Sequence, residues 1–281
     1  MKEMDIHMQH GKFVMMGSVE SNREVQDGHF LMSVRLPLAF ATPRPGQFIL
    51  IHLKNRRDIL LGRPFSISGF HRHAHHVQIE ILYRIAGQGT RLFARLRVGD
   101  DLDILGPLGR PFEIPKGIKN VILVSGGIGI APIRYLLTFI RAMGLERALR
   151  TYFYMGAKTV DELLELEAIR SLCDELQVCT DDCSMGHPGL VTEPLEKALK
   201  SYSLKDTLVC ACGPLGMIRR LSEILTQHPL ACQVSLEERM ACGLGACLGC
   251  AVAVRGQNGE KQYQRVCREG PVFNLRDILW E

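Results

Sequence analysis

Four cysteines near the C-terminus constrain this chain more than any other feature of its sequence. Cys242, Cys247 and Cys250 have the spacing C-x4-C-x2-C, and Cys267 completes the set. This is the plant-type spacing for a [2Fe–2S] cluster, which needs four thiolates that converge from a closely wrapped loop. The residues between the first three cysteines are mostly glycine and alanine, which let the backbone approach closely. We therefore expect these four cysteines to hold a [2Fe–2S] cluster.

A structural zinc site is the alternative interpretation of the same cysteines. Zinc sites favour C-x2-C pairs in both halves, or added histidines. The nearest histidine before the motif is His228, and no histidine follows it. The spacing therefore favours the cluster, but a zinc-stabilised interaction module stays open. The other six cysteines are scattered, and most are expected to be small buried hydrophobic side chains.

The sequence pattern before residue 116 differs from the pattern after it. At about 150 residues per domain, a chain of 281 residues is expected to form two domains. The first part has short apolar segments divided by Pro, Gly and His, which predict a small antiparallel barrel or sandwich. We expect this barrel domain to span residues 12–115, with strands at 30–36, 47–53, 65–69 and 77–84.

From residue 116 the apolar segments alternate between strand and helix patterns. Residues 121–124 are apolar without alternation, which is typical of a buried parallel strand. Helices are expected at 132–143, 160–169 and 214–227, and further strands at 151–155, 176–179, 208–211 and 233–236. This order predicts a doubly wound parallel α/β domain over 116–236. Residues 237–281 then form the cluster-binding segment.

Two glycine-containing loops follow strands of this α/β domain. Gly126, Gly127 and Gly129 lie between a predicted strand and a helix, which is the context of a dinucleotide-phosphate loop. Their spacing is not G-x-G-x-x-G, so a simple turn is the alternative. The second loop is Cys212-Gly213-Pro214. Because ligands bind outside the carboxyl ends of parallel strands, both loops are expected at one edge of the sheet.

The first domain has its own candidate binding motif, Arg63-Pro64-Phe65-Ser66. An arginine beside a strand can pair with a phosphate, and a serine can donate to a ring nitrogen. Leu82-Tyr83-Arg84 and a turn containing Gly89 and Thr90 follow within about 30 residues. Taken separately, these residues are equally consistent with a surface arginine, a strand tyrosine and a glycine turn.

Taken together, the three regions resemble the ferredoxin–NADP reductase superfamily, in which R-P-[FYL]-S is the FAD motif and C-G-P the nicotinamide-side motif. Within it, the chain most resembles the electron transfer subunits of type B dihydroorotate dehydrogenases, through residues 180–186, 238–250 and 265–273. The resemblance implies that FAD contacts Arg63, Pro64, Phe65, Ser66, Leu82, Tyr83, Arg84, Gly89 and Thr90. It implies that NAD lies at Gly126, Gly127, Gly129, Cys212, Gly213 and Pro214. Two residues depart from the family pattern, because Ser125 and Cys183 stand where glycine is usual.

The resemblance also implies an activity. A partner subunit with FMN would oxidise dihydroorotate, and electrons would pass through the cluster and FAD to NAD in pyrimidine (UMP) biosynthesis. FAD belongs between the cluster and NAD because it exchanges both hydrides and single electrons. The expected assembly is a heterotetramer with two copies of each subunit, and no catalytic acid, base or nucleophile is expected in this chain. Related subunits of sulfhydrogenase, sulfite reductase or transhydrogenase type are the nearest alternative.

Composition excludes other classes of function. A net charge of +4 is too small to indicate nucleic-acid binding. Apolar runs fall short of the ~20 residues that span a bilayer, so no membrane association is expected. The charged N-terminal residues do not resemble a signal peptide, and ten cysteines without one indicate a reducing compartment, the cytoplasm. The histidines at 71, 73, 75 and 76 are expected in a solvated turn, with adventitious metal binding as the alternative.

Overall fold

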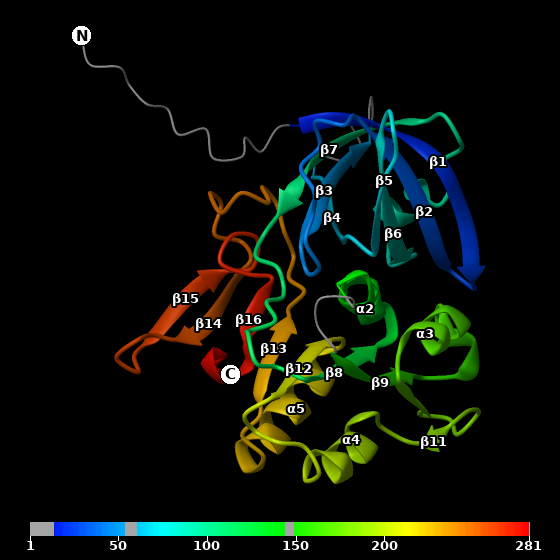
Figure 1. The fold of residues 1–281 in the computed structure, drawn as a ribbon. Coiled ribbons are helices and arrows are strands. Elements are labelled where there is room, and N and C mark those ends of the chain that lie inside the picture. Colours follow the sequence, from blue (N-terminus) through cyan, green and yellow to red (C-terminus); the bar gives the residue numbers. More distant parts are fainter. Residues whose placement is uncertain (1–13, 54–60, 144–148, 281) are drawn as a thin grey trace.

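The computed structural model of the protein describes residues 14–53, 61–143 and 149–280. The first residues of the barrel domain predicted from residue 12, and residue 281, therefore lie outside the described residues. Figure 1 shows three parts: an antiparallel barrel, a sheet with helices beside it, and a C-terminal hairpin that projects to one side. In the described part of the chain, no helix is long and apolar enough to cross a membrane.

Seven strands form the antiparallel sheet of the barrel, in the order β4-β3-β7-β1-β2-β6-β5. A short helix, α1 (Gln88–Phe93), lies between β6 and β7. The strands are β1 (Val14–Gln26), β2 (His29–Leu36), β3 (Phe48–Leu53), β4 (Arg63–Ser66), β5 (Gly69–Arg72), β6 (Val77–Arg84) and β7 (Asp101–Leu108). The predicted strand at 77–84 is confirmed, and β2 and β3 lie within one residue of the expected positions.

The two residues between β4 and β5 close the barrel. The Ile67 amide donates to the carbonyl of Gln47, beside β3, at 3.2 Å. The Ser68 amide donates to the backbone carbonyl of Glu80, in β6, at 2.8 Å. The chain thus crosses from one edge of the sheet to the other at this point. The single strand predicted at 65–69 is wrong for this reason, because the crossing divides it into β4 and β5.

The second sheet has the order β11-β10-β9-β8-β12-β13-β16, and all its strands are parallel except β16. Its strands are β8 (Asn120–Gly126), β9 (Arg150–Ala157), β10 (Glu175–Thr180), β11 (His187–Pro188), β12 (Thr207–Cys212), β13 (Ala231–Ser235) and β16 (Val272–Asn274). Its helices are α2 (Ile130–Ala142), α3 (Leu166–Leu172), α4 (Thr192–Leu199) and α5 (Leu215–Gln227).

Strand β8 shows why helices cover both faces of this sheet. Val121 and Leu123 pack in the cluster of buried residues that contains α2 and α3. Ile122 and Val124 pack in the cluster that contains α4 and α5. Successive strand residues point to opposite faces, so a fully apolar strand must be covered twice. The predicted doubly wound α/β arrangement is confirmed.

The helix predicted at 160–169 is wrong. The structure has a 3-10 turn at Val160–Glu162 and then α3, and the segment between them is not helical. Leu163 and Leu164 are buried in that segment. Glu165 has φ 57, in the left-handed region that interrupts a right-handed helix. The apolar spacing came from a buried loop rather than from one continuous helix face.

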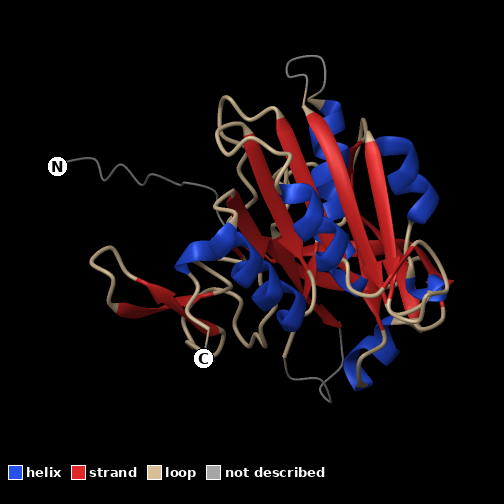
Figure 2. Ribbon diagram, turned by 90° about the horizontal axis from the view of Figure 1, so that it is seen from below, coloured by secondary structure: helices blue, strands red, loops and turns tan. Residues whose placement is uncertain are grey.

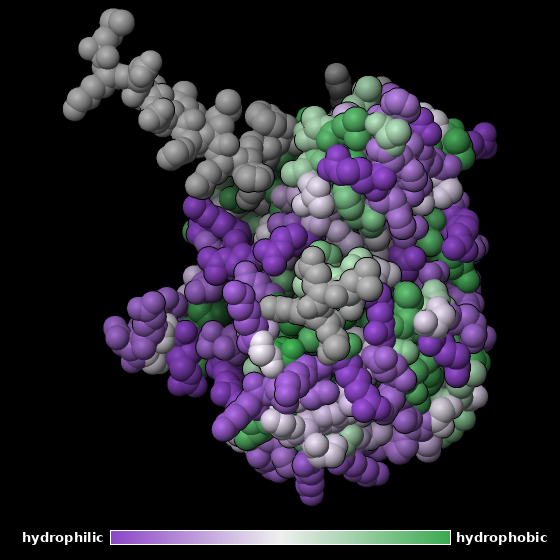
Figure 3. Space-filling model, in the orientation of Figure 1, coloured by the Kyte–Doolittle hydropathy of each residue, from purple (hydrophilic) through white to green (hydrophobic). Residues whose placement is uncertain are grey.

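The C-terminal segment is joined to the α/β sheet. Strands β14 (Ala251–Arg255) and β15 (Lys261–Arg265) form a hairpin that projects from the molecule at the left of Figure 2. This hairpin is largely hydrophilic on the face shown in Figure 3. After the hairpin, β16 pairs antiparallel with β13 and becomes the edge of the sheet.

Helix α2 connects the sheet to the barrel through two side chains. Arg134 donates to the carbonyl of Ser68 at 2.8 Å and to the carboxylate of Glu80 at 2.6 Å. The hydroxyl of Tyr135 donates to the carbonyl of Pro43 at 2.7 Å. The side chains of Arg134 and Glu80 are each 15% exposed, so their ion pair is largely removed from water.

Replacement of Arg134 should therefore destabilise the protein. Arg134→Ala leaves the carboxylate of Glu80 in a desolvated interface without its main partner, and we expect a loss of about 3 kcal/mol. Arg150→Ala breaks the exposed Arg150–Glu175 pair and should cost less than about 1 kcal/mol. Urea unfolding of the cofactor-loaded chains measures both. Equal losses in the two variants would contradict the role given to Arg134.

Candidate cofactor sites

A pocket of about 280 Å³ lies where the three parts of the chain meet. Barrel strands β3, β4 and β6, the start of α2 and the segment after β13 all contribute to it. The predicted FAD residues that line it are Pro64, Phe65, Ser66, Leu82, Tyr83 and Arg84. The lining residues outside the barrel include Ile128, Ala131, Ser235, Leu236, Glu237, Glu238 and Met240. The barrel motif and the second domain therefore face one cavity.

The other three predicted FAD residues lie beside this pocket. Arg63 lines a neighbouring pocket with Glu237 and Met240. A Cβ atom on Gly89 would lie 2.6 Å from Nε of Arg63, so the guanidinium rests on the turn that opens α1. The Thr90 hydroxyl accepts from the amides of Ala86 and Gly87 at 2.8 and 3.1 Å. Thr90 thus shapes this turn.

The aromatic rings of Phe65 and Tyr83 belong to the barrel core. Their centroids are 5.5 Å apart, and Phe65 also packs edge-on against Phe93 at 5.1 Å. The Tyr83 hydroxyl donates to the side-chain oxygen of Asn22 at 3.0 Å, and burial raises its pKa. Since both side chains are buried, they fix the shape of the pocket wall.

The two predicted nucleotide loops are in direct contact at the carboxyl edge of the parallel sheet. A Cβ atom on Gly129 would collide with the carbonyl oxygen of Cys212, and one on Gly126 would lie 2.8 Å from Cδ of Pro214. Gly127 has φ +51. The structure therefore brings Gly126, Gly127 and Gly129 together with Cys212, Gly213 and Pro214.

A row of small polar side chains crosses the sheet at the same edge. Ser125, Cys212 and Ser235 are register partners on the adjacent strands β8, β12 and β13. The Cys212 thiol is buried, which raises its pKa, and it contacts Ser235. Among the described residues, the buried hydroxyl of Ser125 has no hydrogen-bond partner. Ser125, one of the two departures from the family pattern, thus places a hydroxyl beneath the glycine loop.

The second departure, Cys183, has an exposed thiol in the loop after β10. Its φ is 65, in the left-handed region that glycine adopts without strain. This backbone conformation explains why glycine is usual at the position. Cys183 is not one of the four cysteines of the predicted cluster site.

Those four cysteines lie on two segments that pack together. The Leu244 amide donates to the sulfur of Cys242 at 3.4 Å, and the Cys267 amide donates to the sulfur of Cys250 at 3.5 Å. Cys250 and Cys267 are buried, while Cys247 is exposed. The thiols of Cys242 and Cys247 also contact each other. The predicted ligands therefore lie close together as two pairs, Cys242 with Cys247 and Cys250 with Cys267.

The surroundings of these thiols give them very different acidities. Burial raises the pKa of Cys242, but N–H groups of Leu244, Cys247 and Ala246 outweigh it and lower the pKa to about 6. Burial and the neighbouring Cys250 raise the pKa of Cys267 to about 12. In the described part of the chain, no group of three or more His, Cys, Asp or Glu side chains lies close enough together to hold a metal ion. A donor set of four cysteines with amide donors nearby fits an iron–sulfur cluster.

Sequence reasoning missed the segment that links the pocket to the cysteines. Glu237, Glu238 and Met240 follow β13 and line the pocket. Burial raises the pKa of Glu237, which the Arg84 charge partly offsets. The rule that placed the two loops, that ligands bind at the carboxyl ends of parallel strands, applies equally to β13 and would have found this segment.

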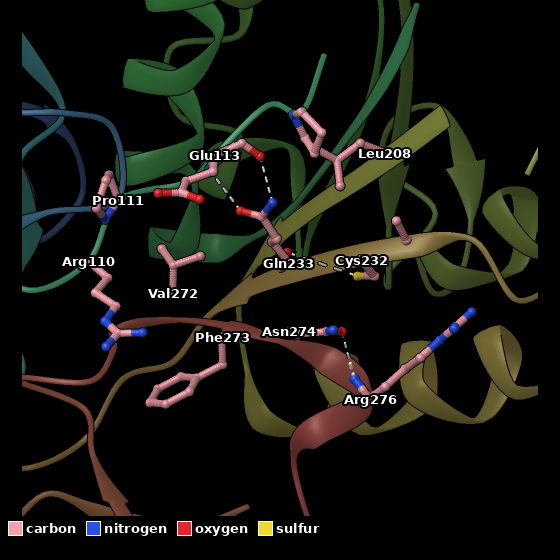
Figure 4. Close-up of a pocket in the computed structure, with 12 residues that line it drawn as sticks. Arg110, Pro111, Glu113, Leu208, Cys232, Gln233, Val272, Phe273, Asn274 and Arg276 are labelled. Atoms are coloured by element: carbon pink, nitrogen blue, oxygen red, sulfur yellow. Dashed lines mark hydrogen bonds between the residues drawn. The ribbon is translucent and has the colours of Figure 1, made fainter. Parts of the chain in front are cut away.

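Two other features carry none of the predicted cofactor residues. A cleft of about 370 Å³, shown in Figure 4, lies among Arg110, Glu113, Gln233 and Arg276, near the amino ends of β12 and β13. The side-chain amide of Gln233 bonds to the backbone of Glu113 there (Figure 4).

The histidines predicted in a turn lie at the β5–β6 hairpin, where the rings of His73 and His76 stack at 4.5 Å.

Comparison with known proteins decides between the interpretations of the cysteine motif. The family model described as the iron-sulfur cluster binding domain of dihydroorotate dehydrogenase B matches residues 237–279, and an oxidoreductase NAD-binding domain matches 123–223. A relative from Caldanaerobacter subterraneus is 40% identical over 85% of this chain and 88% of its own length. It is named dihydroorotate dehydrogenase B (NAD(+)), electron transfer subunit.

This chain belongs to the family of dihydroorotate dehydrogenase B electron transfer subunits. A second member, from Clostridium acetobutylicum, is 33% identical over 93% of this chain and 95% of its own. Members of this family are NAD-linked oxidoreductase subunits for electron transfer, as predicted. The matched domains and the reductase fold identify the cofactors as a [2Fe–2S] cluster, FAD and NAD.

Solved structures confirm the predicted fold class. A chain of the NADH-dependent reduced ferredoxin-NADP oxidoreductase superimposes with a TM-score of 0.79 at 26% identity, covering 96% of this chain and 91% of that chain. A ferredoxin NADP+ reductase from Neisseria gonorrhoeae, solved with FAD and NADP, has a TM-score of 0.63 at 15% identity. It covers 78% of this chain and 92% of its own.

The cysteine environments predict different reactivities in the cluster-free chain. Because the pKa of Cys242 is about 6, its thiolate predominates above that pH, and alkylation by iodoacetamide should reach a plateau near neutrality. Cys267, with a pKa of about 12, should remain unlabelled between about pH 5 and pH 9. Mass spectrometry of the labelled peptides measures both. A Cys242 rate that still rises steeply at the upper end of this range would contradict the assignment.

Proposed function

We propose that this electron transfer subunit passes electrons from the FMN of a partner dihydroorotate dehydrogenase subunit to NAD, in the cytoplasm. The relatives' name, electron transfer subunit, implies a separate catalytic subunit. The proposed assembly has two copies of each chain and serves pyrimidine biosynthesis. One observation carries the proposal: the segment from Ser235 to Met240 lines the central pocket, and the first cluster cysteine, Cys242, follows two residues later.

The central pocket is the proposed FAD site, and the nine residues named from the sequence are its proposed contacts. FAD, when bound, exchanges a hydride with NAD and single electrons with the cluster. Arg63 is proposed to pair with the pyrophosphate, because its guanidinium lies beside the pocket on the Gly89 turn. Phe65 and Tyr83 hold the wall in shape, and Ser66 presents a hydroxyl to the cavity.

The contact between the two glycine-containing loops is the proposed NAD site. No atom lies within 4 Å of a Cβ position on Gly127, so the start of α2 is open to an anion there. Gly126 and Gly129 let Cys212, Gly213 and Pro214 pack directly against this loop. Ile128 and Ala131 line the FAD pocket from this same loop and helix. The loop is therefore placed to hold NAD next to FAD.

Cys242, Cys247, Cys250 and Cys267 are the proposed cluster ligands, and their surroundings are the proposed contact with the partner subunit. Cys247 is exposed, and the flanking Leu244 and Leu248 are 44% and 63% exposed. Exposed apolar side chains around a redox centre suit a protein partner, because docking removes them from water. The proposed domain limits are 12–115, 116–236 and 237–281.

The cluster and FAD should be separable by mutation. Cys247→Ser removes one proposed ligand on the outer loop, so we expect the iron–sulfur absorbance to disappear while FAD stays bound. Cys183→Ser changes another exposed thiol and should leave both spectra unchanged. Iron, sulfide and flavin analysis of the purified chains measures the outcome. An intact cluster in Cys247→Ser would overturn the proposed ligand set.

The NAD site is tested by adding one methyl group to a loop. Gly129→Ala would force the two loops apart, because its Cβ collides with the Cys212 carbonyl. A displacement of about 1 Å can cost roughly 100-fold, so we expect the Kd for NADH to rise at least about tenfold with FAD retained. Gly216→Ala is the control, because no atom lies within 4 Å of its Cβ position. Unchanged NADH binding in Gly129→Ala would refute this site.

A further inference from the structure

An ion pair on the turn that carries Cys267 reaches the loop that carries the other three cysteines. The Arg265 guanidinium donates through Nε to Oε2 of Glu269 at 2.8 Å and through Nη2 to Oε1. Its remaining nitrogen, Nη1, donates to the carbonyl of Gly245 at 2.9 Å. All three guanidinium nitrogens are thus engaged. Arg265 and Glu269 thus form a two-contact ion pair on this turn.

The turn itself does not need this ion pair. The amides of Arg268, Glu269 and Gly270 all donate to the carbonyl of Arg265, at 3.1, 2.9 and 3.2 Å. These backbone bonds already fold residues 265–270 around Cys267. Within the turn, the Glu269 carboxylate also accepts from the Arg265 amide at 2.8 Å. Beyond the turn, the Arg265 side chain adds the connection to Gly245, which lies 20 residues earlier in the chain.

The two cysteine-bearing segments touch at Gly245 and at Cys250. The carbonyl of Gly245 accepts from Arg265 at 2.9 Å, and the sulfur of Cys250 accepts from the Cys267 amide at 3.5 Å. A Cβ atom on Gly245 would lie 2.8 Å from Cδ of Arg268, so the stem of that side chain packs against Gly245. The Arg265 guanidinium therefore holds the loop of the first three cysteines against the turn whose Cys267 N–H donates to the Cys250 sulfur.

Hydrogen bonds to the sulfurs and nearby charges set the reduction potential of an iron–sulfur cluster. Groups that orient such donors from outside the ligand set commonly change metal-site properties 10–100-fold when mutated. We propose that Arg265 and Glu269 are positioning residues for the cluster, because they hold the two cysteine-bearing segments together. They thereby keep the Cys267 N–H on the Cys250 sulfur, which raises the reduction potential. The proposal rests on the four proposed cysteine ligands.

The test compares Arg265→Gln with Arg268→Gln in the full chain. Both variants lose one positive charge near the cluster and keep most of an aliphatic stem, but only the first loses the bond to the Gly245 carbonyl. A redox titration followed by electron paramagnetic resonance measures the cluster midpoint potential. For Arg265→Gln we expect the equilibrium constant for one-electron reduction of the cluster to fall at least tenfold. This corresponds to a midpoint potential about 59 mV lower. The shift in Arg268→Gln should be clearly smaller.

Equal shifts in the two variants would overturn the proposal, because only the lost charge would then matter. No shift in either variant would also overturn it, because the bond to Gly245 would then have no effect on the potential. If Arg265→Gln does not retain a cluster, Arg265→Lys gives the same test with the charge kept. Its potential should still fall, and a wild-type potential in Arg265→Lys would overturn the proposal.

Iron and sulfide analysis of the wild-type chain is a separate control. A wild-type chain without a cluster would overturn the ligand set, whereas an unshifted potential with the cluster present overturns only this inference.

Discussion

The contact between α2 and the barrel determines where every cofactor site lies. Arg134 joins α2 to Ser68 and Glu80, which belong to the part of the barrel that closes it. The start of the same helix carries the glycine loop that meets Cys212. One helix thus fixes the barrel pocket and the nucleotide edge of the sheet relative to each other. A pocket wall built from both domains requires such a fixed contact.

The C-terminal segment depends on the same arrangement. The chain leaves the sheet at the end of β13 and then lines the pocket. It returns to the same sheet after Cys267, because β16 is paired with β13. The loop of the first three cysteines packs against the barrel, since a Cβ on Gly243 would touch Leu108 and Leu50 at 3.3 Å. The cluster site is therefore attached to both domains. This explains how a short segment without a large core of its own can hold a redox centre in place.

The sequence was informative where local chemistry determines the structure. The short apolar segment at 77–84 predicted β6, and the fully apolar 121–124 predicted a buried parallel strand, which is β8. The cysteine spacing predicted the cluster, which the family comparison confirms. The two glycine loops were predicted at one edge, and the structure brings them into contact. The individual contacts of each residue with FAD and NAD remain predictions.

Features that depend on distant contacts were not predictable in this way. Strand β16 has three residues and exists because β13 offers an open edge, which no local pattern indicates. The left-handed conformation of Glu165, which divides the helix expected at 160–169, follows two buried leucines, and the Glu165 carboxylate pairs with Arg134 of α2 at 3.4 Å. The ion pair between Arg265 and Glu269 reads locally as an i,i+4 surface pair, and only the fold shows its bond to Gly245.

The central claim is that NAD, FAD and the cluster form one connected path in this chain. The most direct measurement is the visible absorption spectrum of the chain purified without oxygen, before and after NADH is added. We expect flavin bands with a broad iron–sulfur shoulder, and both should bleach with NADH. A colourless protein that binds zinc, or a flavin that bleaches while the cluster stays oxidised, would contradict it.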